Sequence, residues 1–173
     1  QLSFGSMPND GGNLMLEEDD AKALLAADPA AKKFVRPILG SVEYINSIPR
    51  YCLWLKGATP NELRSHPEIM QRVARVRAKR AESTRPETRS LADTPTLFGE
   101  DRQPTKNFLA VPKTSSESRR YIPIGFLAPS IVANTELFTS EEAGLYHFGV
   151  LTSSMHMAWV RAVCGRLKSD YRY

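Results

Sequence analysis

The 173-residue chain has a formal net charge of +4, and 42% of its residues are hydrophobic. This length and composition suit one domain, or a compact pair of subdomains, with a true core, and the mild positive charge permits a polyanionic partner without requiring one. The chain has neither a run of about 18 apolar residues nor a basic and then apolar leader, which argues against a membrane span and a signal peptide. Two cysteines, Cys52 and Cys164, favour reduced thiols in a cytoplasm over a disulfide scaffold.

The N-terminal segment is predicted to be a loop followed by helix. Residues 1–13 are rich in glycine and asparagine, and they lead into a short strand at 13–16. The acidic run at 17–20 favours a helix N-terminus through the helix dipole. Because proline interrupts a helix, Pro29 is expected to divide 17–34 into two short helices.

The next elements are a strand and two helices. Residues 51–55 are aromatic and apolar, as expected of a strand. Thr59, Pro60 and Glu62 form a cap, a first-turn proline and a capping-box acid, which predicts a helix start. A longer helix is predicted over 67–82. Its apolar stripe consists of Ile69, Val73 and Val76.

The remaining surface of that longer helix is basic. Its cations are Arg72, Arg75, Arg77, Lys79 and Arg80, with Arg85 nearby. Spacing alone supports either a solvated face or contacts with phosphates, and we keep both interpretations.

The second half is predicted to be an ordered loop or linker at 83–105, followed by alternating strands and turns. The segment 97–99 is expected to pin the loop to the core. The clearest strands are 108–111 and 121–127, and 145–151 is a further apolar run in this region.

A helix is then expected from Thr152 or Ser153 to about residue 166, followed by an extended segment. Three apolar residues of this helix, Met155, Trp159 and Val163, stand at helical spacing. Trp54 and Trp159 are predicted to be core residues rather than base-stacking groups. His147 and His156 are expected in or beside the core.

Side chains that alternate along the final extended segment place Lys168, Asp170 and Arg172 on one face of a strand. Lysine donates to guanine O6 and N7, and aspartate accepts from cytosine N4, so the Lys168–Asp170 pair suits one G·C base pair. A surface salt bridge between them is the alternative.

The chain lacks recognisable catalytic motifs. It has no glycine-rich cofactor loop, no Asn-Pro-Pro-Tyr-like motif, no nuclease set of acids and lysine, and no phosphate-binding loop. Its three histidines and two cysteines have no metal-ligand spacing. We therefore expect no catalytic and no metal site in this chain.

Three blocks resemble the target-recognition domain of the MmeI-like restriction–modification enzymes. These blocks are Leu91–Glu100, Ser115–Gly125 and Leu145–Tyr173, and Pro8–Asn13 is similar too. The resemblance covers nearly the whole chain. It implies a fragment of a larger bacterial, cytoplasmic enzyme with a nuclease domain and an adenine-N6 methyltransferase domain. S-adenosylmethionine and Mg²⁺ are implied for that parent, and no cofactor is expected in this fragment.

The resemblance also implies which residues read bases in the major groove of double-stranded DNA. The implied readers are Lys113, Thr135, Glu136, Lys168, Asp170 and Arg172. Phosphate contacts, which position a domain without reading sequence, are expected from other cations. These are Arg119, Arg120, Arg161, Arg166, Arg72, Arg75 and Lys79. Solvation at a strand edge is the alternative for Arg119 and Arg120.

The resulting prediction is an α+β domain, a mixed sheet with flanking helices, over residues 1–173. Within it we expect an N-terminal subregion at 1–58 and a C-terminal reading subregion at 106–173. The methyltransferase domain of the parent is the expected protein partner, with no membrane partner. The rival functions are a protein–protein docking or specificity subunit that contacts DNA weakly, and a complete small enzyme with an unrecognised site.

Overall fold

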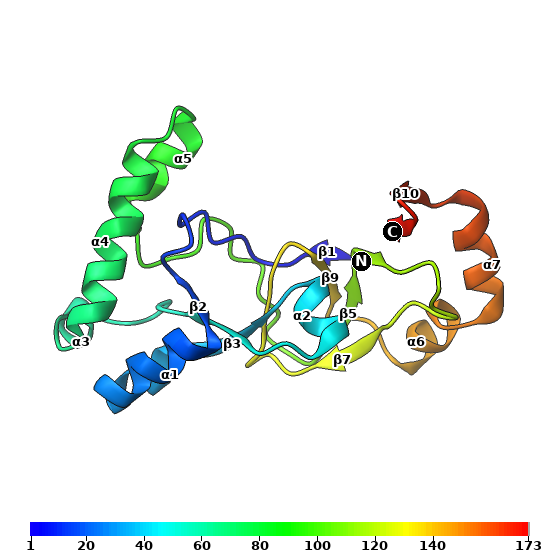
Figure 1. Ribbon diagram of the computed structural model, residues 1–173, viewed down its shortest axis with the longest axis horizontal. Helices are drawn as coiled ribbons and strands as arrows, with labels where there is room; N and C mark the ends of the chain where they lie inside the picture. The colour runs from blue at the N-terminus through cyan, green and yellow to red at the C-terminus, as the bar shows by residue number, and fades with distance from the viewer. Residues whose placement is uncertain (173) are drawn as a thin grey trace. The chain divides into compact units, whose positions relative to one another are not determined.

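The computed structural model describes residues 1–172, and the fold is α+β, as the sequence predicts (Figure 1). Tyr173, the last residue of the third matching block, lies outside the described residues. The chain forms two compact units from alternating segments. Unit 1 comprises Gln1–Gly5, Leu39–Ile48 and the chain from Arg102 onward, and unit 2 comprises Ser6–Ile38 and Pro49–Asp101.

Unit 2 combines a small antiparallel sheet with helices. The central strand of this sheet, β4 (Arg50–Leu53), pairs with β2 (Met15–Glu17) on one side and β3 (Val35–Leu39) on the other. The α-helices are α1 (Glu18–Ala27), α3 (Pro60–Arg64), α4 (Pro67–Ala81) and α5 (Pro86–Ser90), with 3-10 helices at Pro29–Phe34 and Leu91–Asp93.

Local signals in unit 2 are confirmed. Thr59 caps α3, and its hydroxyl accepts a hydrogen bond from the Glu62 N–H at 3.3 Å. The predicted stripe on α4 is buried. Phe98 is buried against Trp54, with ring centroids 4.9 Å apart, which confirms the expected anchor of the 83–105 segment. That segment also holds α5 and a 3-10 helix, so it is more ordered than a loop.

Unit 1 is built on the antiparallel sheet β1-β9-β5-β7, visible around the N-terminus in Figure 1. Its strands are β1 (Ser3–Phe4), β9 (Leu137–Ser140), β5 (Phe108–Pro112) and β7 (Gly125–Leu127). A second sheet has the order β10 (Gly165–Leu167), β11 (Asp170–Arg172) and β6 (Thr114–Ser115). The remaining elements are α2 (Ser41–Asn46), α6 (Leu145–Leu151), α7 (Ser154–Val163) and β8 (Val132–Ala133).

The central strand β5 is buried along its whole length and has a core cluster on each face. Since side chains alternate along a strand, Leu109 and Val111 join Met157 and Val160 of α7 on one face. On the other face Phe108 and its neighbours pack against residues near and within α2. The helices α6 and α7 therefore cover one face of the sheet.

Two predictions for the middle of unit 1 are wrong in whole or in part. The strand expected over 121–127 begins only at Gly125, because Pro123 has no N–H to donate and Ile122 turns into the core. The apolar run at 145–151, expected among strands and turns, is the helix α6. The His147 side chain caps its start, because His147 Nδ1 accepts a hydrogen bond from the Gly144 N–H at 3.2 Å.

The helix α7 starts at the predicted cap, where Ser153 Oγ accepts from the His156 N–H at 3.1 Å. It ends at Val163, three residues before the expected end. Trp54 is buried as predicted, but Trp159 is 66% exposed, so its assignment to the core of this unit is wrong. His147, also expected near the core, is exposed because it caps α6 at the surface.

Candidate nucleic-acid interface

The chain after α7 forms a β-hairpin rather than one extended strand. β10 pairs with β11, Leu167 lies opposite Asp170, and Lys168 and Ser169 form the turn between them. Lys168 has a φ of 58°, in the left-handed region that a two-residue hairpin turn requires. The predicted single face of Lys168, Asp170 and Arg172 is therefore wrong for Lys168, because the chain reverses direction at that residue.

Asp170 and Arg172 do share one face of β11. Tyr171 between them is 5% exposed and belongs to the core cluster that includes Met157 and Val160. Because neighbouring side chains on a strand point to opposite faces, the burial of Tyr171 directs its two neighbours away from the core. The buried tyrosine thus fixes the outward orientation of two predicted readers.

The hairpin pairs with the strand that follows Lys113. Arg172 lies opposite Thr114, and Tyr171 lies opposite Ser115. The Lys113 N–H donates to the Glu136 carbonyl at 2.9 Å, and Lys113 Nζ lies 3.4 Å from Glu136 Oε1. Residues that are far apart in the sequence are thereby brought together. We call this set, Lys113, Thr135, Glu136, Asp170 and Arg172, the polar edge.

The charges of the polar edge differ in how far they are neutralised. Lys113 and Glu136 form the ion pair just described, and Lys113 Nζ also lies 5.6 Å from the Phe4 ring centroid. Among residues 1–172, the side chains of Lys168, Asp170 and Arg172 form no hydrogen bond or ion pair, and Lys168 and Arg172 are exposed. The surface salt bridge between Lys168 and Asp170 is thus not formed in this structure. These three side chains keep their donors and acceptors available to a ligand.

Arg166, predicted to contact phosphate, instead contacts residues of the hairpin and of the segment after β6. Its guanidinium donates to the Ser169 carbonyl at 2.8 Å and to Glu117 Oε2 at 3.0 Å. It also lies 4.0 Å from the Tyr171 ring centroid and within 3.4 Å of the tyrosine hydroxyl. These contacts tie the turn, β11 and the segment after β6 together, so Arg166 positions the hairpin.

The three other predicted phosphate contacts of unit 1 lie at its surface. Arg119, Arg120 and Arg161 are all exposed. Arg161 Nη2 lies 3.5 Å from the Arg120 carbonyl, and Arg120 stacks 5.2 Å from the Tyr121 ring centroid. Since a carbonyl and an aromatic face leave their positive charges unneutralised, these residues are arranged to attract an anion.

The basic helix α4 belongs to unit 2, and two of its arginines form hydrogen bonds within that unit. Arg72 contacts Glu68 and the carbonyls of Asn13 and Met15. Arg75 Nε donates to Asn13 Oδ1 at 3.1 Å, whereas Lys79 is exposed. These residues are distinct from the polar edge, which lies wholly in unit 1.

Arg80 is the cation of α4 whose role the sequence did not reveal. It is 1% exposed, and its guanidinium donates five hydrogen bonds of 2.7–3.0 Å to backbone carbonyls. The acceptors are Pro8, Asn9, Leu91, Thr94 and Leu97. Burial lowers the pKa of this guanidinium, and Asp10 nearby opposes that effect. No local sequence signal distinguishes Arg80 from the other cations of α4, because its acceptors lie 11 to 72 residues away.

Cys52 and the Asp28–His66 pair are held in structural contacts of unit 2. Burial raises the pKa of the Cys52 thiol to about 12, so it is not a thiolate at neutral pH. His66 Nδ1 lies 2.5 Å from Asp28 Oδ2, and this hydrogen bond holds the pKa of Asp28 below its ordinary value.

Within residues 1–172, no cluster of three or more His, Cys, Asp or Glu side chains could hold a metal ion. No helix in that range is long and apolar enough to cross a membrane.

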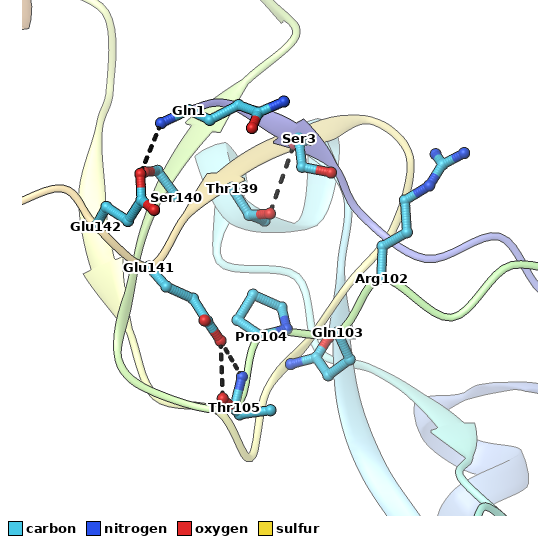
Figure 2. A pocket seen from close by; sticks show the side chains of 10 residues that line it. All are labelled: Gln1, Ser3, Arg102, Gln103, Pro104, Thr105, Thr139, Ser140, Glu141 and Glu142. Carbon is cyan, nitrogen blue, oxygen red and sulfur yellow. Dashed lines mark hydrogen bonds and ion pairs between the residues drawn. The ribbon is translucent and has the colours of Figure 1, made fainter.

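A polar hollow of about 460 Å³ lies beside β9 (Figure 2). Glu141 occupies it and accepts hydrogen bonds from the Thr105 N–H, the Thr105 hydroxyl and the Lys106 N–H. The Thr105 N–H is the main reason that the pKa of Glu141 is lowered. The carboxylate is already engaged with the chain, so it is not set up to act on a ligand.

The architecture defines an α+β binding domain with an exposed polar edge. The model of the MmeI target recognition domain matches residues 1–173, and the chain therefore belongs to that family. It is 39% identical over 173 residues to DNA methyltransferase A of Bacillus subtilis (strain 168). It also superposes, with a TM-score of 0.94 and 36% identity, on the type IIL restriction-modification enzyme MmeI, solved in complex with DNA.

These findings confirm the resemblance that the sequence blocks indicated. The match covers 100% of this chain, but only 20% of the Bacillus relative and 23% of the solved MmeI chain. The chain thus spans about a fifth of the length of the proteins it matches.

Proposed function

We propose that this domain reads base sequence in double-stranded DNA for a restriction–modification enzyme. The observation that carries the proposal is the hairpin, which points Asp170 and Arg172 outward with no partner among the described side chains. Arginine is suited to guanine O6 and N7, and a carboxylate accepts from cytosine N4. Membership of the target recognition family and the DNA complex of MmeI support the same conclusion.

The remaining predicted readers fit this role at the same edge. Lys113, Thr135 and Glu136 lie beside the hairpin, and Lys168 extends from its turn. Arg119, Arg120 and Arg161 are proposed to hold phosphates, which would fix the register of the domain without reading sequence. Arg72, Arg75 and Lys79 remain proposed phosphate contacts on α4, where Arg75 and Lys79 are exposed and Arg72 is half-buried.

The parent is proposed to be a bacterial cytoplasmic enzyme that methylates adenine N6 and cleaves DNA at the site this domain selects. S-adenosylmethionine and Mg²⁺ would be held by other domains of that parent. The cofactor would supply the methyl group when bound, and this chain would position the DNA.

The proposal is tested by exchanging hairpin residues in the full-length parent. Asp170→Arg with Arg172→Asp reverses donor and acceptor while leaving Tyr171 in place. A methylation map should then show a changed preference at the base pairs the hairpin reads, at about 1–3 kcal/mol per wrong base pair, with other positions retained. The matched control is Lys106→Ala, an exposed cation away from the polar edge, which should leave the map unchanged.

If the exchanged variant methylates the parental site unchanged, the hairpin is not a reader. A second candidate function, protein docking with weak DNA contact, is favoured by the exposed apolar residues of α6 and α7. The two are separated by binding to duplex DNA over a range of salt, because phosphate contacts release counterions. A reader loses affinity steeply with salt, whereas a docking module does not.

A further inference from the structure

The helices α6 and α7 carry apolar side chains on the side that does not pack against the sheet. Leu145, Tyr146 and Met155 are 80%, 79% and 82% exposed, and Trp159 and Val163 are more than half exposed. On α7 the exposed residues Met155, Trp159 and Val163 recur every four residues, so they form one stripe. We call these five residues the apolar face.

The same helix is also apolar on its buried side. Met157 and Val160 of α7 lie in the core, and Arg161 is the single charged residue of the helix. A helix that is apolar almost all round is typical of the interior of a larger protein. The composition of α7 is therefore that of a helix covered on both sides.

Two hollows lie beside the apolar face. One, of about 320 Å³, is lined by Trp159 and by core residues such as Ile124 and Phe138. The other, of about 360 Å³, is lined by Tyr146 and Val150, and Leu2 and Leu151 line both. The two hollows share Leu2 and Leu151 in their linings, and we call the pair the apolar trough.

The chemistry of the trough excludes DNA as its occupant. Among the described residues that line the first hollow there is no Lys, Arg, Asp or Glu, and the second adds the carboxylate of Glu142. A phosphate backbone needs cations, and an acid at the rim would repel it. An apolar protein surface is the matching partner, since contiguous exposed apolar patches mark protein interaction sites.

We propose that the apolar face and its trough dock against another domain of the same parent polypeptide. The relatives that this chain matches are about five times as long, so most of such a parent lies outside these residues. Another domain of one polypeptide is held near the apolar face at high effective concentration, which favours docking within the chain over association between separate molecules.

This inference rests on the proposed parent enzyme but not on which residues read bases. It is tested in the full-length parent, without DNA, by thiol labelling of single cysteine variants against the background of the native cysteines. Met155→Cys and Val163→Cys probe the apolar face, and Val42→Cys on α2, which is 60% exposed, is the matched control. All three sites should label alike after denaturation.

We expect the two probes on the apolar face to label at least tenfold more slowly than Val42→Cys in the native parent, at every protein concentration. Labelling as fast as the control would overturn the proposal. Protection that disappears on dilution would assign the face to a second copy of the protein, and protection that appears only with DNA would assign it to the DNA interface. Either outcome would also overturn it. Failure of the hairpin exchange would leave these labelling rates unaffected, so the two proposals fail separately.

Discussion

Two regions rich in arginine and lysine use their charges in opposite ways. In unit 2 the cations of α4 turn largely toward their own chain, and Arg80 is fully enclosed by five carbonyls. In unit 1 the cations around the hairpin remain at the surface, and Arg172 has no side-chain partner among the described residues. Arg166 and Lys113 are exceptions, since Arg166 is engaged by Glu117, Ser169 and Tyr171 and Lys113 is paired with Glu136.

The difference teaches that the number of cations in a segment does not identify a DNA-binding surface. A guanidinium can satisfy its donors with carbonyls of its own fold as well as with phosphate oxygens. What distinguishes a binding residue is a side chain whose donors are left without acceptors after folding. The following experiments test this distinction, from the largest expected effect to the smallest.

Arg80→Met should destabilise the protein by about 3 kcal/mol or more. All five carbonyls lose the guanidinium donor. Those of Pro8, Leu91 and Thr94 keep a backbone N–H, whereas those of Asn9 and Leu97 are orphaned, and each orphaned group costs about 1–3 kcal/mol before relaxation or water entry. Urea unfolding of this variant measures the loss. Arg77→Met on the same helix is the control, because Arg77 is exposed, and its stability should stay near that of the wild type. Equal stability of both variants would refute the structural role of Arg80.

Arg166→Lys should reduce discrimination between correct and incorrect base pairs about tenfold in the parent, equivalent to about 1.4 kcal/mol. Lysine keeps the charge but cannot contact Glu117, the Ser169 carbonyl and the Tyr171 ring together, so the hairpin loses its support. Competition binding with matched and mismatched duplexes measures this ratio. Loss of affinity for all sequences alike, with discrimination intact, would instead support the phosphate role predicted from the sequence.

Replacing Arg119 and Arg120 together by alanine should weaken binding to all duplexes about equally. The slope of log affinity against log salt should fall by roughly two, about one for each lost phosphate contact. Binding titrations at several salt concentrations provide the slope. A change in site preference with an unchanged slope would place these residues among the base readers.

Glu62→Gln should have the smallest effect, a modest loss of stability near neutral pH that disappears in acidic solution. The Lys33 ammonium at 2.8 Å and the Thr59 cap lower the pKa of Glu62 from 4.5 to about 2. A carboxyl whose pKa is lower in the folded state stabilises above its unfolded pKa, and that contribution is lost as pH falls. Between pH 4.5 and 2 the wild type should lose more stability than the variant. Parallel unfolding curves for both proteins would show that Glu62 does not contribute.

Local signals in the sequence predicted much of the fold. The capping box at Thr59, the stripe along α4 and the cap at Ser153 each depend on residues within a few positions of one another. The hairpin was missed because Lys168-Ser169 lacks the asparagine–glycine or aspartate–glycine pair typical of such turns. Its register instead depends on Tyr171 reaching the core and on β6, about 55 residues earlier in the chain.

Only part of the candidate site could be predicted, because some of its residues depend on contacts between distant segments. The family resemblance placed Lys113, Glu136 and Arg172 in one role, and the structure brings them to one edge. No pattern could show that Arg166 bonds to its own hairpin or that Trp159 stays exposed. Both depend on packing between distant segments, and the exposed stripe of α7 has the same spacing as a core stripe.

The placement of Tyr171 between Asp170 and Arg172 has an evolutionary consequence. The residue that anchors β11 and the residues that face outward alternate, so selection can act on them separately. Substitutions at the outward positions leave the buried tyrosine and the strand pairing unchanged. A lineage could therefore acquire a new DNA site through single outward substitutions, with little loss of foldability to be compensated elsewhere.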